Sequence, residues 1–176
     1  MFAAANSGFL TVQGKSSQMS ELKLIALDAD DLNVISAHLQ DAVGRAGDIA
    51  YKPGGRRFAM VLNRFDWPDA GAKNSAANPA ARGGGASTYG RCQTALRFEK
   101  VDAVRSIGID RSRKQDVVSL LAIGFTESEP PSGTVTLYFS GGPQIAIDVE
   151  CIEAELRDLG AAWTTTRRPE HPEDEV

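Results

Sequence analysis

Short segments in which apolar and polar residues alternate occupy most of the chain between residues 48 and 149, and glycine- and proline-rich turns separate them. Alternation places successive side chains on opposite faces of the backbone, which is typical of half-buried β-strands. The clearest examples are residues 56–67, 92–98, 101–109, 134–139 and 144–149. The pattern predicts a sheet built largely from hairpins.

Two details of this pattern carry further expectations. Residues 48–52 and 56–67 flank Lys52-Pro53-Gly54-Gly55. Proline fixes φ at the first corner of a turn and glycine accepts positive φ at the next, which predicts a type II turn in a hairpin. Residues 117–125 are almost continuously apolar, which predicts a strand buried on both faces.

A helix is predicted near each end of the chain. After an apolar strand at residues 22–27, Asp28, Asp30 and Asp31 can supply the cap and the first turn of a helix. Its buried stripe would be Leu32, Ile35, Leu39 and Val43, and Gly44 or Gly47 can end it. Ile152, Leu156 and Leu159 share one helical face, which predicts a second helix over residues 151–159 before Gly160.

The order of these elements predicts an α+β fold. About seven antiparallel strands would form a pleckstrin-homology-like barrel, or a two-sheet arrangement, with a C-terminal capping helix and an N-terminal strand and helix. The alternative is an open antiparallel sheet with both helices on one face.

Composition divides the 176 residues into one domain and three segments with little apolar content. The globular domain is predicted over residues 20–163, with a flexible loop at 69–90 rich in Ala, Gly, Ser and Asn. A disordered N-terminal extension is expected over residues 1–19, with Met19 as a candidate natural start, and a disordered acidic tail over 164–176. Such segments bury too little apolar surface to offset the entropy of ordering.

The sequence shows no arrangement typical of a catalytic or metal site, and we expect no cofactor. Cys92 and Cys151, with His38 and His171, lack the spacing of metal ligands. Acidic residues flank Cys151, which disfavours a reactive thiolate. No segment is apolar enough to cross a membrane and no signal peptide is evident, so a cytoplasmic location is expected.

Charge is distributed unevenly along the chain. Residues 1–44 carry a net charge of −3, residues 45–114 carry +8, and residues 115–176 carry −9. The basic segment could form a binding face for an anionic partner, or acidic residues of the C-terminal part could neutralise it. The candidate binding residues, three of which lie in the compact stretch 63–67, are Arg56, Arg57, Arg64, Asp66, Trp67, Arg91, Arg97 and Arg105.

Three functions are compatible with these features. The leading hypothesis is a non-enzymatic binding or adaptor module that recognises an acidic protein or a small anionic ligand through the basic strand region. The first alternative is an enzyme of unknown class with a cleft near Arg64, Asp66 and His38, and the second is a structural, oligomerising subunit. A pI near 5.2 and the lack of a basic–aromatic strand motif argue against nucleic acid as the partner.

Four short motifs resemble those of a family of uncharacterised alphaproteobacterial proteins, domain of unknown function 2948. They are GDIAY at 47–51, NRFDW at 63–67, SLLAI at 119–123 and, most specifically, VECIEAELRDLG at 149–160. The resemblance spans most of residues 47–163 and implies a domain extent and a bacterial origin. It implies no activity.

Overall fold

The computed structural model describes residues 22–66, 89–160 and 163–165, which form ten strands, one α-helix and one short 3₁₀ turn. In chain order the elements are β1 (Lys23–Ala26), α1 (Ala29–Leu39), β2 (Ala42–Lys52), η1 (Pro53–Gly55), β3 (Arg57–Asp66), β4 (Tyr89–Phe98), β5 (Val101–Ile107), β6 (Val117–Glu127), β7 (Gly133–Phe139), β8 (Gln144–Val149), β9 (Ala154–Asp158) and β10 (Trp163–Thr165).

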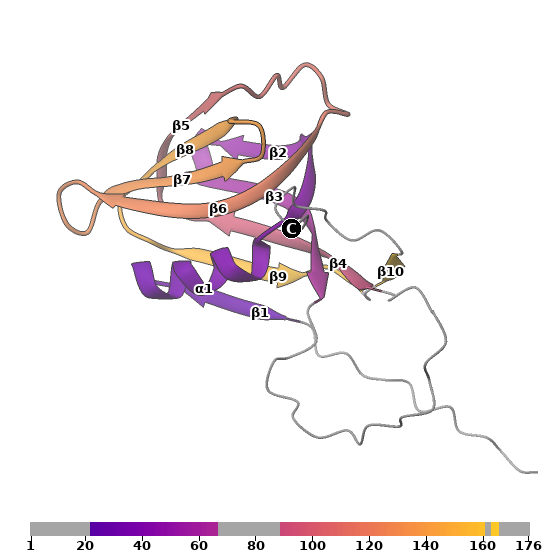
Figure 1. Ribbon diagram of the computed structural model, residues 1–176. Coiled ribbons are helices and arrows are strands. Elements are labelled where there is room, and N and C mark those ends of the chain that lie inside the picture. The colour runs from indigo at the N-terminus through magenta and orange to yellow at the C-terminus, as the bar shows by residue number, and fades with distance from the viewer. Residues whose placement is uncertain (1–21, 67–88, 161–162, 166–176) are drawn as a thin grey trace, which may run out of the picture.

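All of these strands belong to one antiparallel sheet. Nine follow the order β1-β9-β4-β3-β2-β6-β7-β8-β5, and β10 pairs with the beginning of β4. The sheet is bent so that β5 and β8 face β2 and β3, as Figure 1 shows. Its terminal strands, β1 and β5, are not paired with each other, so the sheet stays open.

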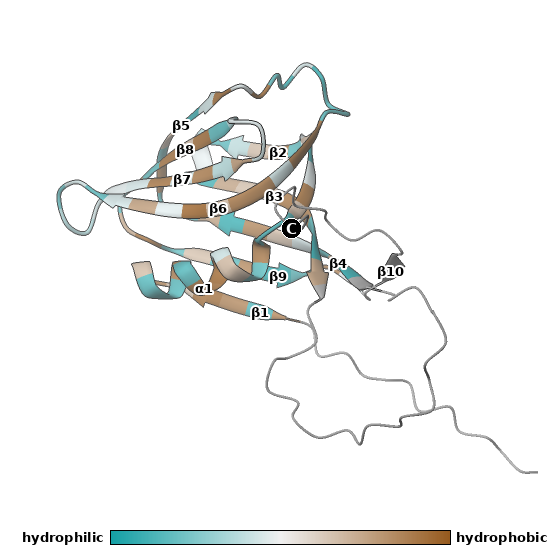
Figure 2. Ribbon diagram, viewed as in Figure 1, coloured by the Kyte–Doolittle hydropathy of each residue, from teal (hydrophilic) through white to brown (hydrophobic). Residues whose placement is uncertain are grey.

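The core lies inside this bend. Hydrophobic and hydrophilic residues alternate along many of the strands (Figure 2), so one face of each strand is buried. On β3, for example, Phe58, Met60 and Leu62 are fully buried. Partners from the other side of the bend include Val135, Leu137, Ile145 and Ile147.

Helix α1 covers part of the open interior and contacts β1 and β6. Asp28 caps it by accepting a 2.8 Å hydrogen bond from the backbone N–H of Asp31. Leu32, Ile35 and Leu39 form its buried stripe, as the sequence predicts. The helix ends at Leu39, and the predicted fourth member of the stripe, Val43, lies in β2 instead.

Two connections between strands lie together at one corner of the bend and are joined by hydrogen bonds. The connections β4–β5 and β8–β9 run side by side, since the N–H of Glu99 donates to the carbonyl of Glu153 and the N–H of Glu150 donates to that of Lys100. At the same corner the N–H of Val101 donates to the carbonyl of Arg56, which fixes the start of β5 beside the β2–β3 hairpin. Beyond Val101, no described strand pairs with the free edge of β5, and a seam remains.

The structure contradicts the predicted fold class. The fold is nearly all-β rather than α+β, and the sheet is open rather than a pleckstrin-homology-like barrel. The predicted second helix is wrong, because β9 occupies this segment. Ile152, Ala154, Leu156 and Asp158 are buried, so every second residue of this segment faces the core. Because Ala154 is small and Asp158 is charged, the sequence does not show this alternation, and its large apolar residues also fit a helix.

Two smaller expectations also fail. The β2–β3 hairpin is confirmed, but its turn is a 3₁₀ turn in which Arg56, not a glycine, takes the left-handed conformation at φ 48°. Strand β6 is not buried on both faces, because Val117 and Leu121 are exposed while Leu120 and Ile123 are buried. The continuous apolar sequence at 117–125 arises because its residues on the exposed face of β6 are uncharged, as are those on its buried face.

Most of the segments predicted to lack order fall outside the described residues. This applies to the extension at 1–19, to loop 69–90 apart from its last two residues, which begin β4, and to the tail from residue 166 onward. Residues 164 and 165 belong to β10.

Candidate functional site

Arg64 lies in the interior and is held by a carboxylate. It follows Phe58, Met60 and Leu62 on the buried face of β3. Its Nε and Nη2 donate to the two carboxylate oxygens of Asp158 on β9, at 3.0 and 2.8 Å. The two side chains are only 7% and 4% exposed, so this ion pair is part of the core.

Asp158 also ties the start of the described chain to the sheet. One carboxylate oxygen accepts a 2.9 Å hydrogen bond from the backbone N–H of Leu22, just before β1. Burial alone would raise the pKa of the Asp158 carboxyl. The hydrogen bonds from Arg64 and Leu22 outweigh burial, so the pKa lies below its usual range.

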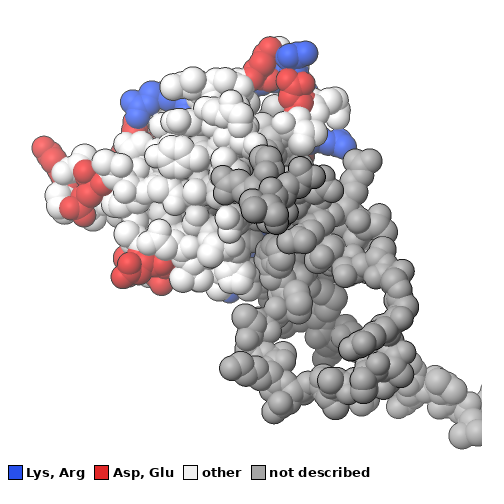
Figure 3. Space-filling model, in the orientation of Figure 1, with Lys and Arg blue, Asp and Glu red and all other residues white. Residues whose placement is uncertain are grey.

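Four of the other predicted arginines are paired with carboxylates at the surface; three of them are exposed and Arg97 is half-buried. Arg56 contacts Asp102 and Glu150, Arg57 contacts Glu99, Arg97 contacts Glu99 and Glu155, and Arg105 contacts Asp148, all at 2.6–3.1 Å. Several of these acids belong to the C-terminal part of the chain, as the neutralisation interpretation expects. The described surface over β6 and β7 is uncharged in the view of Figure 3, and charged side chains appear around its margin.

The predicted binding residues on β3 and β4 also lie on opposite faces of the sheet. Arg57, Arg91 and Arg97 lie on the outer face of β3 and β4, opposite the buried residues, while Arg64 points inward. The guanidinium of Arg91 stacks on the ring of Phe65, 4.2 Å from its centroid, and burial lowers the pKa of Arg91. The side chain of Asp66 and all of Trp67 lie outside the described residues.

The residues of the predicted enzyme cleft do not form a described site. His38 lies in the last turn of α1, while the described hydrogen bonds of Arg64 go to Asp158 and to the carbonyl of Phe65. Cys92 is buried, with its Sγ 3.3 Å from the carbonyl oxygen of Gly160. Cys151 is a half-buried free thiol. Its negative charge, when ionised, raises the pKa of the nearby Lys100 amine.

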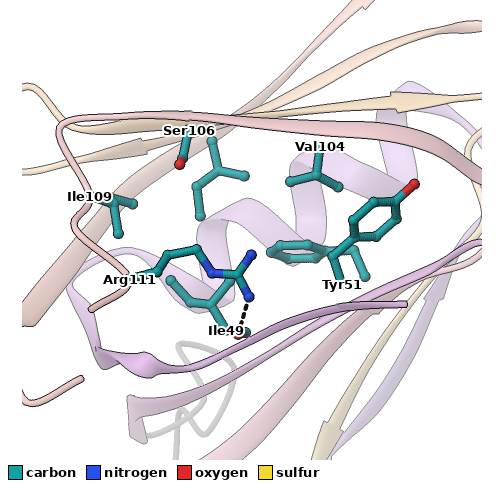
Figure 4. Close-up of a pocket in the computed structure, with 8 residues that line it drawn as sticks. Ile49, Tyr51, Val104, Ser106, Ile109 and Arg111 are labelled. Atoms are coloured by element: carbon teal, nitrogen blue, oxygen red, sulfur yellow. Dashed lines mark hydrogen bonds between the residues drawn. The ribbon is translucent and has the colours of Figure 1, made fainter. Parts of the chain in front are cut away.

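A pocket lies at the seam between the two sides of the bend. Ile49 and Tyr51 on β2 and Phe58 on β3 line one side, and Val104 and Ser106 on β5 line the other; Ile109, Arg111 and Ile145 complete it. Phe58, Ile145 and Ile49 are almost fully buried. Figure 4 shows the guanidinium of Arg111 lying between the β2 and β5 side chains, across the seam.

Arg111 differs from the paired arginines. Its Nη2 donates a long hydrogen bond of 3.4 Å to the carbonyl oxygen of Ile49, and no carboxylate of the described residues lies within ion-pair distance. The hydroxyl of Tyr51 is already engaged, since it donates to the carbonyl of Asp102 at 3.0 Å. The pocket therefore combines a mainly apolar lining with one cation for which the described residues supply no counter-charge.

The loop that carries Arg111 is fixed at several points. Asp110 accepts hydrogen bonds from the backbone N–H and the hydroxyl of Ser112, and its carbonyl accepts a 3.1 Å hydrogen bond from the backbone N–H of Arg113. The N–H of Gly47 donates to the carbonyl of Lys114 at 3.0 Å and joins the loop to β2. The guanidinium is thus held near the seam before any ligand arrives.

Sequence reasoning missed both Arg111 and Asp158. A signal for the buried pair existed, because Arg64 shares the parity of Phe58, Met60 and Leu62 and so must enter the core. Arg111 stands in a polar loop with Arg113 and Lys114, where nothing in the local pattern distinguishes it. Its position depends on how β5 returns to face β2.

Fold and site together define a nearly all-β protein with one open, bent antiparallel sheet and a small apolar pocket at its seam. The chain belongs to the family described as a protein of unknown function, DUF2948, whose model matches residues 22–171. No curated protein and no solved structure matches the chain.

Two classes of feature were not found in the described part of the chain. No group of three or more His, Cys, Asp or Glu side chains there is arranged to hold a metal ion. No helix within residues 22–66, 89–160 and 163–165 has the length and apolar character needed to span a membrane.

Proposed function

We propose that this protein is a non-enzymatic binding module for a small anionic ligand, which it takes into the seam pocket. The observation that carries the proposal is Arg111, a guanidinium held over an apolar pocket with no carboxylate of the described chain beside it. A guanidinium remains charged at physiological pH and binds carboxylates and phosphates through paired N–H groups. An anion placed here would supply the counter-charge.

The lining supports binding more than catalysis. Its polar groups are the Arg111 guanidinium, the Ser106 hydroxyl and the Tyr51 hydroxyl, and the last is engaged with a backbone carbonyl. A general base within hydrogen-bond reach of the substrate is the usual requirement for proton transfer, and no carboxylate, histidine or thiol lines this pocket among the described residues. An apolar pocket with few polar groups is typical of a ligand site.

The proposal is tested by following backbone amide signals in nuclear magnetic resonance spectra during titration with small carboxylates, phosphate esters and sulfate esters. We expect at least one anion to shift amides of β2, β5 and residues 108–113, and Arg111→Gln to abolish the shifts. Arg113→Gln in the same loop is the matched control and should keep them. If none of the anions shifts these amides at millimolar concentration, the proposal is wrong.

One observation favours a second candidate, a subunit that associates with its own copy. Leu121 in β6 and Tyr138 in β7 are 42% and 41% exposed. The surface over these two strands is uncharged in the view of Figure 3. Sedimentation velocity of the wild type and of Leu121→Lys tests this candidate. A wild-type dimer that dissociates in the variant supports it, and a wild-type monomer at high concentration excludes it.

A further inference from the structure

The size of the seam pocket limits what can enter it. The cavity has a volume of about 60 Å³. One water-sized group needs about 10–15 Å³ on this scale, so the cavity accepts about four to six such groups. A short aliphatic chain fits this size, whereas a nucleoside or a fused ring system does not.

The floor of the pocket selects for an apolar group. Phe58 and Ile145 are buried to 0% and 1% exposure, and Ile49 to 8%, with Val104 and Ile109 beside them. Transfer of apolar surface from water into such a lining is favourable by about 25 cal/mol per Å². The part of the ligand that reaches the floor should therefore be a hydrocarbon.

The polar groups of the pocket select for a single negative charge. Arg111 is the one charged residue among the eight described residues of the lining, and the Ser106 hydroxyl can add one more hydrogen bond. The planar guanidinium matches a carboxylate in both shape and charge. A phosphate dianion would retain an uncompensated charge beside apolar walls, which is costly.

The current partner of Arg111 is easily exchanged. Its hydrogen bond to the carbonyl oxygen of Ile49 is 3.4 Å long, well beyond the 2.7–2.9 Å of a strong charge-assisted bond. A ligand carboxylate at the seam can take its place while the loop stays fixed through Asp110 and Lys114. Binding thus requires little rearrangement.

We infer that the ligand is a short-chain aliphatic monocarboxylate, which binds with its hydrocarbon tail against Phe58 and Ile145 and its carboxylate on Arg111. The inference rests on the proposed function and adds the chemical class of the ligand. It follows from the volume of the cavity, its apolar floor and its single cation.

Calorimetric titration with three probes that share a branched tail tests the inference: 4-methylpentanoate, the neutral 4-methylpentanamide and 3-methylbutyl phosphate. We expect the acid to bind more tightly than either of the others. A charge-assisted hydrogen bond is worth about 1.5–3 kcal/mol, so Arg111→Gln should weaken binding of the acid by about tenfold or more. Val104→Phe, which fills the cavity but keeps Arg111, should also abolish binding, and Arg113→Gln should leave it unchanged.

The outcomes separate this inference from the proposed function. If the phosphate ester binds more tightly than the acid, and does so through Arg111, the carboxylate inference is wrong while anion binding at the seam stands. If the amide binds as tightly as the acid, both are contradicted. If none of the three probes binds, the carboxylate inference is wrong, and the titration with the wider set of anions decides the proposed function. Amide spectra of the variants that overlay the wild type away from the seam show that loss of binding is not loss of fold.

Discussion

Arg64 and Arg111 lie in two regions of the same bent sheet, and the fold treats their charges differently. Arg64 is buried, its Nε and Nη2 donate to the carboxylate of Asp158 on β9, and its Nη1 donates to the carbonyl of Phe65. Arg111 crosses an open seam and makes one long hydrogen bond to a backbone carbonyl. The first arginine links β3 to β9, whereas the second leaves most of its hydrogen-bonding capacity for another molecule.

The comparison shows why a count of arginines does not identify a binding site. The segment from 45 to 114 is strongly basic, yet five of the six arginines predicted to bind are paired with carboxylates. Exposed pairs of this kind contribute little to stability and present little net charge. The charge that can attract a ligand is the one that the fold does not neutralise.

Removal of the buried carboxylate should have the largest effect on stability. In Asp158→Asn the buried Arg64 guanidinium loses the carboxylate to which its Nε and Nη2 donate, and we expect the free energy of unfolding in urea to fall by about 3–5 kcal/mol. Asp148→Asn, which breaks the exposed pair with Arg105, is the matched control and should cost less than about 1 kcal/mol. Equal losses in the two variants would contradict the distinction between buried and exposed pairs.

Acid should reduce the contribution of the buried pair. The pKa of Asp158 is lowered in the folded state, so its stabilising effect is complete above its unfolded pKa of about 3.9 and is lost as pH falls through the folded value. The stability difference between the wild type and Asp158→Asn should be constant above about pH 5 and shrink below about pH 4. Urea unfolding curves at a series of pH values measure this difference in stability. A difference that grows on acidification would mean that the pKa of Asp158 is raised, not lowered, in the folded state.

The sequence allowed prediction of the local elements better than of their assembly. The capped helix α1, the β2–β3 hairpin and the β7–β8 hairpin follow from patterns within about ten residues, and the structure contains all three. The segment that forms β9 also fits a helix, because Ile152, Leu156 and Leu159 share a helical face and the charge of Asp158 masks the strand period. Asp158 is buried through contacts with distant residues, the N–H of Leu22 and Arg64, which is 94 positions away.

The candidate site could not be predicted for a related reason. The seam forms because the connection after β4 carries β5 to the opposite end of the sheet, where it faces β2 without pairing. Residues from positions 49 to 145 meet there, and no local motif connects them.

The half-buried surface pair of Arg97 and Glu155 should show a small coupling that salt removes. A double-mutant cycle on Arg97→Gln and Glu155→Gln should give about 0.2–1 kcal/mol at low ionic strength and close to zero in about 0.5 M NaCl. The same salt should leave the effect of Asp158→Asn nearly unchanged. If the coupling free energy between Arg97 and Glu155 persists at high salt, this pair is as well shielded from solvent ions as the buried pair.

The smallest expected effect on stability is that of Arg111→Gln. Loss of one long hydrogen bond at an exposed side chain should change the free energy of unfolding by less than about 0.5 kcal/mol. Thermal and urea unfolding measure the change. A decrease of several kcal/mol in the free energy of unfolding would mean that Arg111 stabilises the fold and would argue against its role as a ligand-binding residue.

The most direct test follows the side-chain Nε–Hε signals of Arg111 and Arg64 in one spectrum while 4-methylpentanoate is added. If Arg111 is the ligand site, the Arg111 signal moves with saturable dependence on concentration and the Arg64 signal does not. An Arg111 signal that stays in place while the acid binds elsewhere would contradict the account.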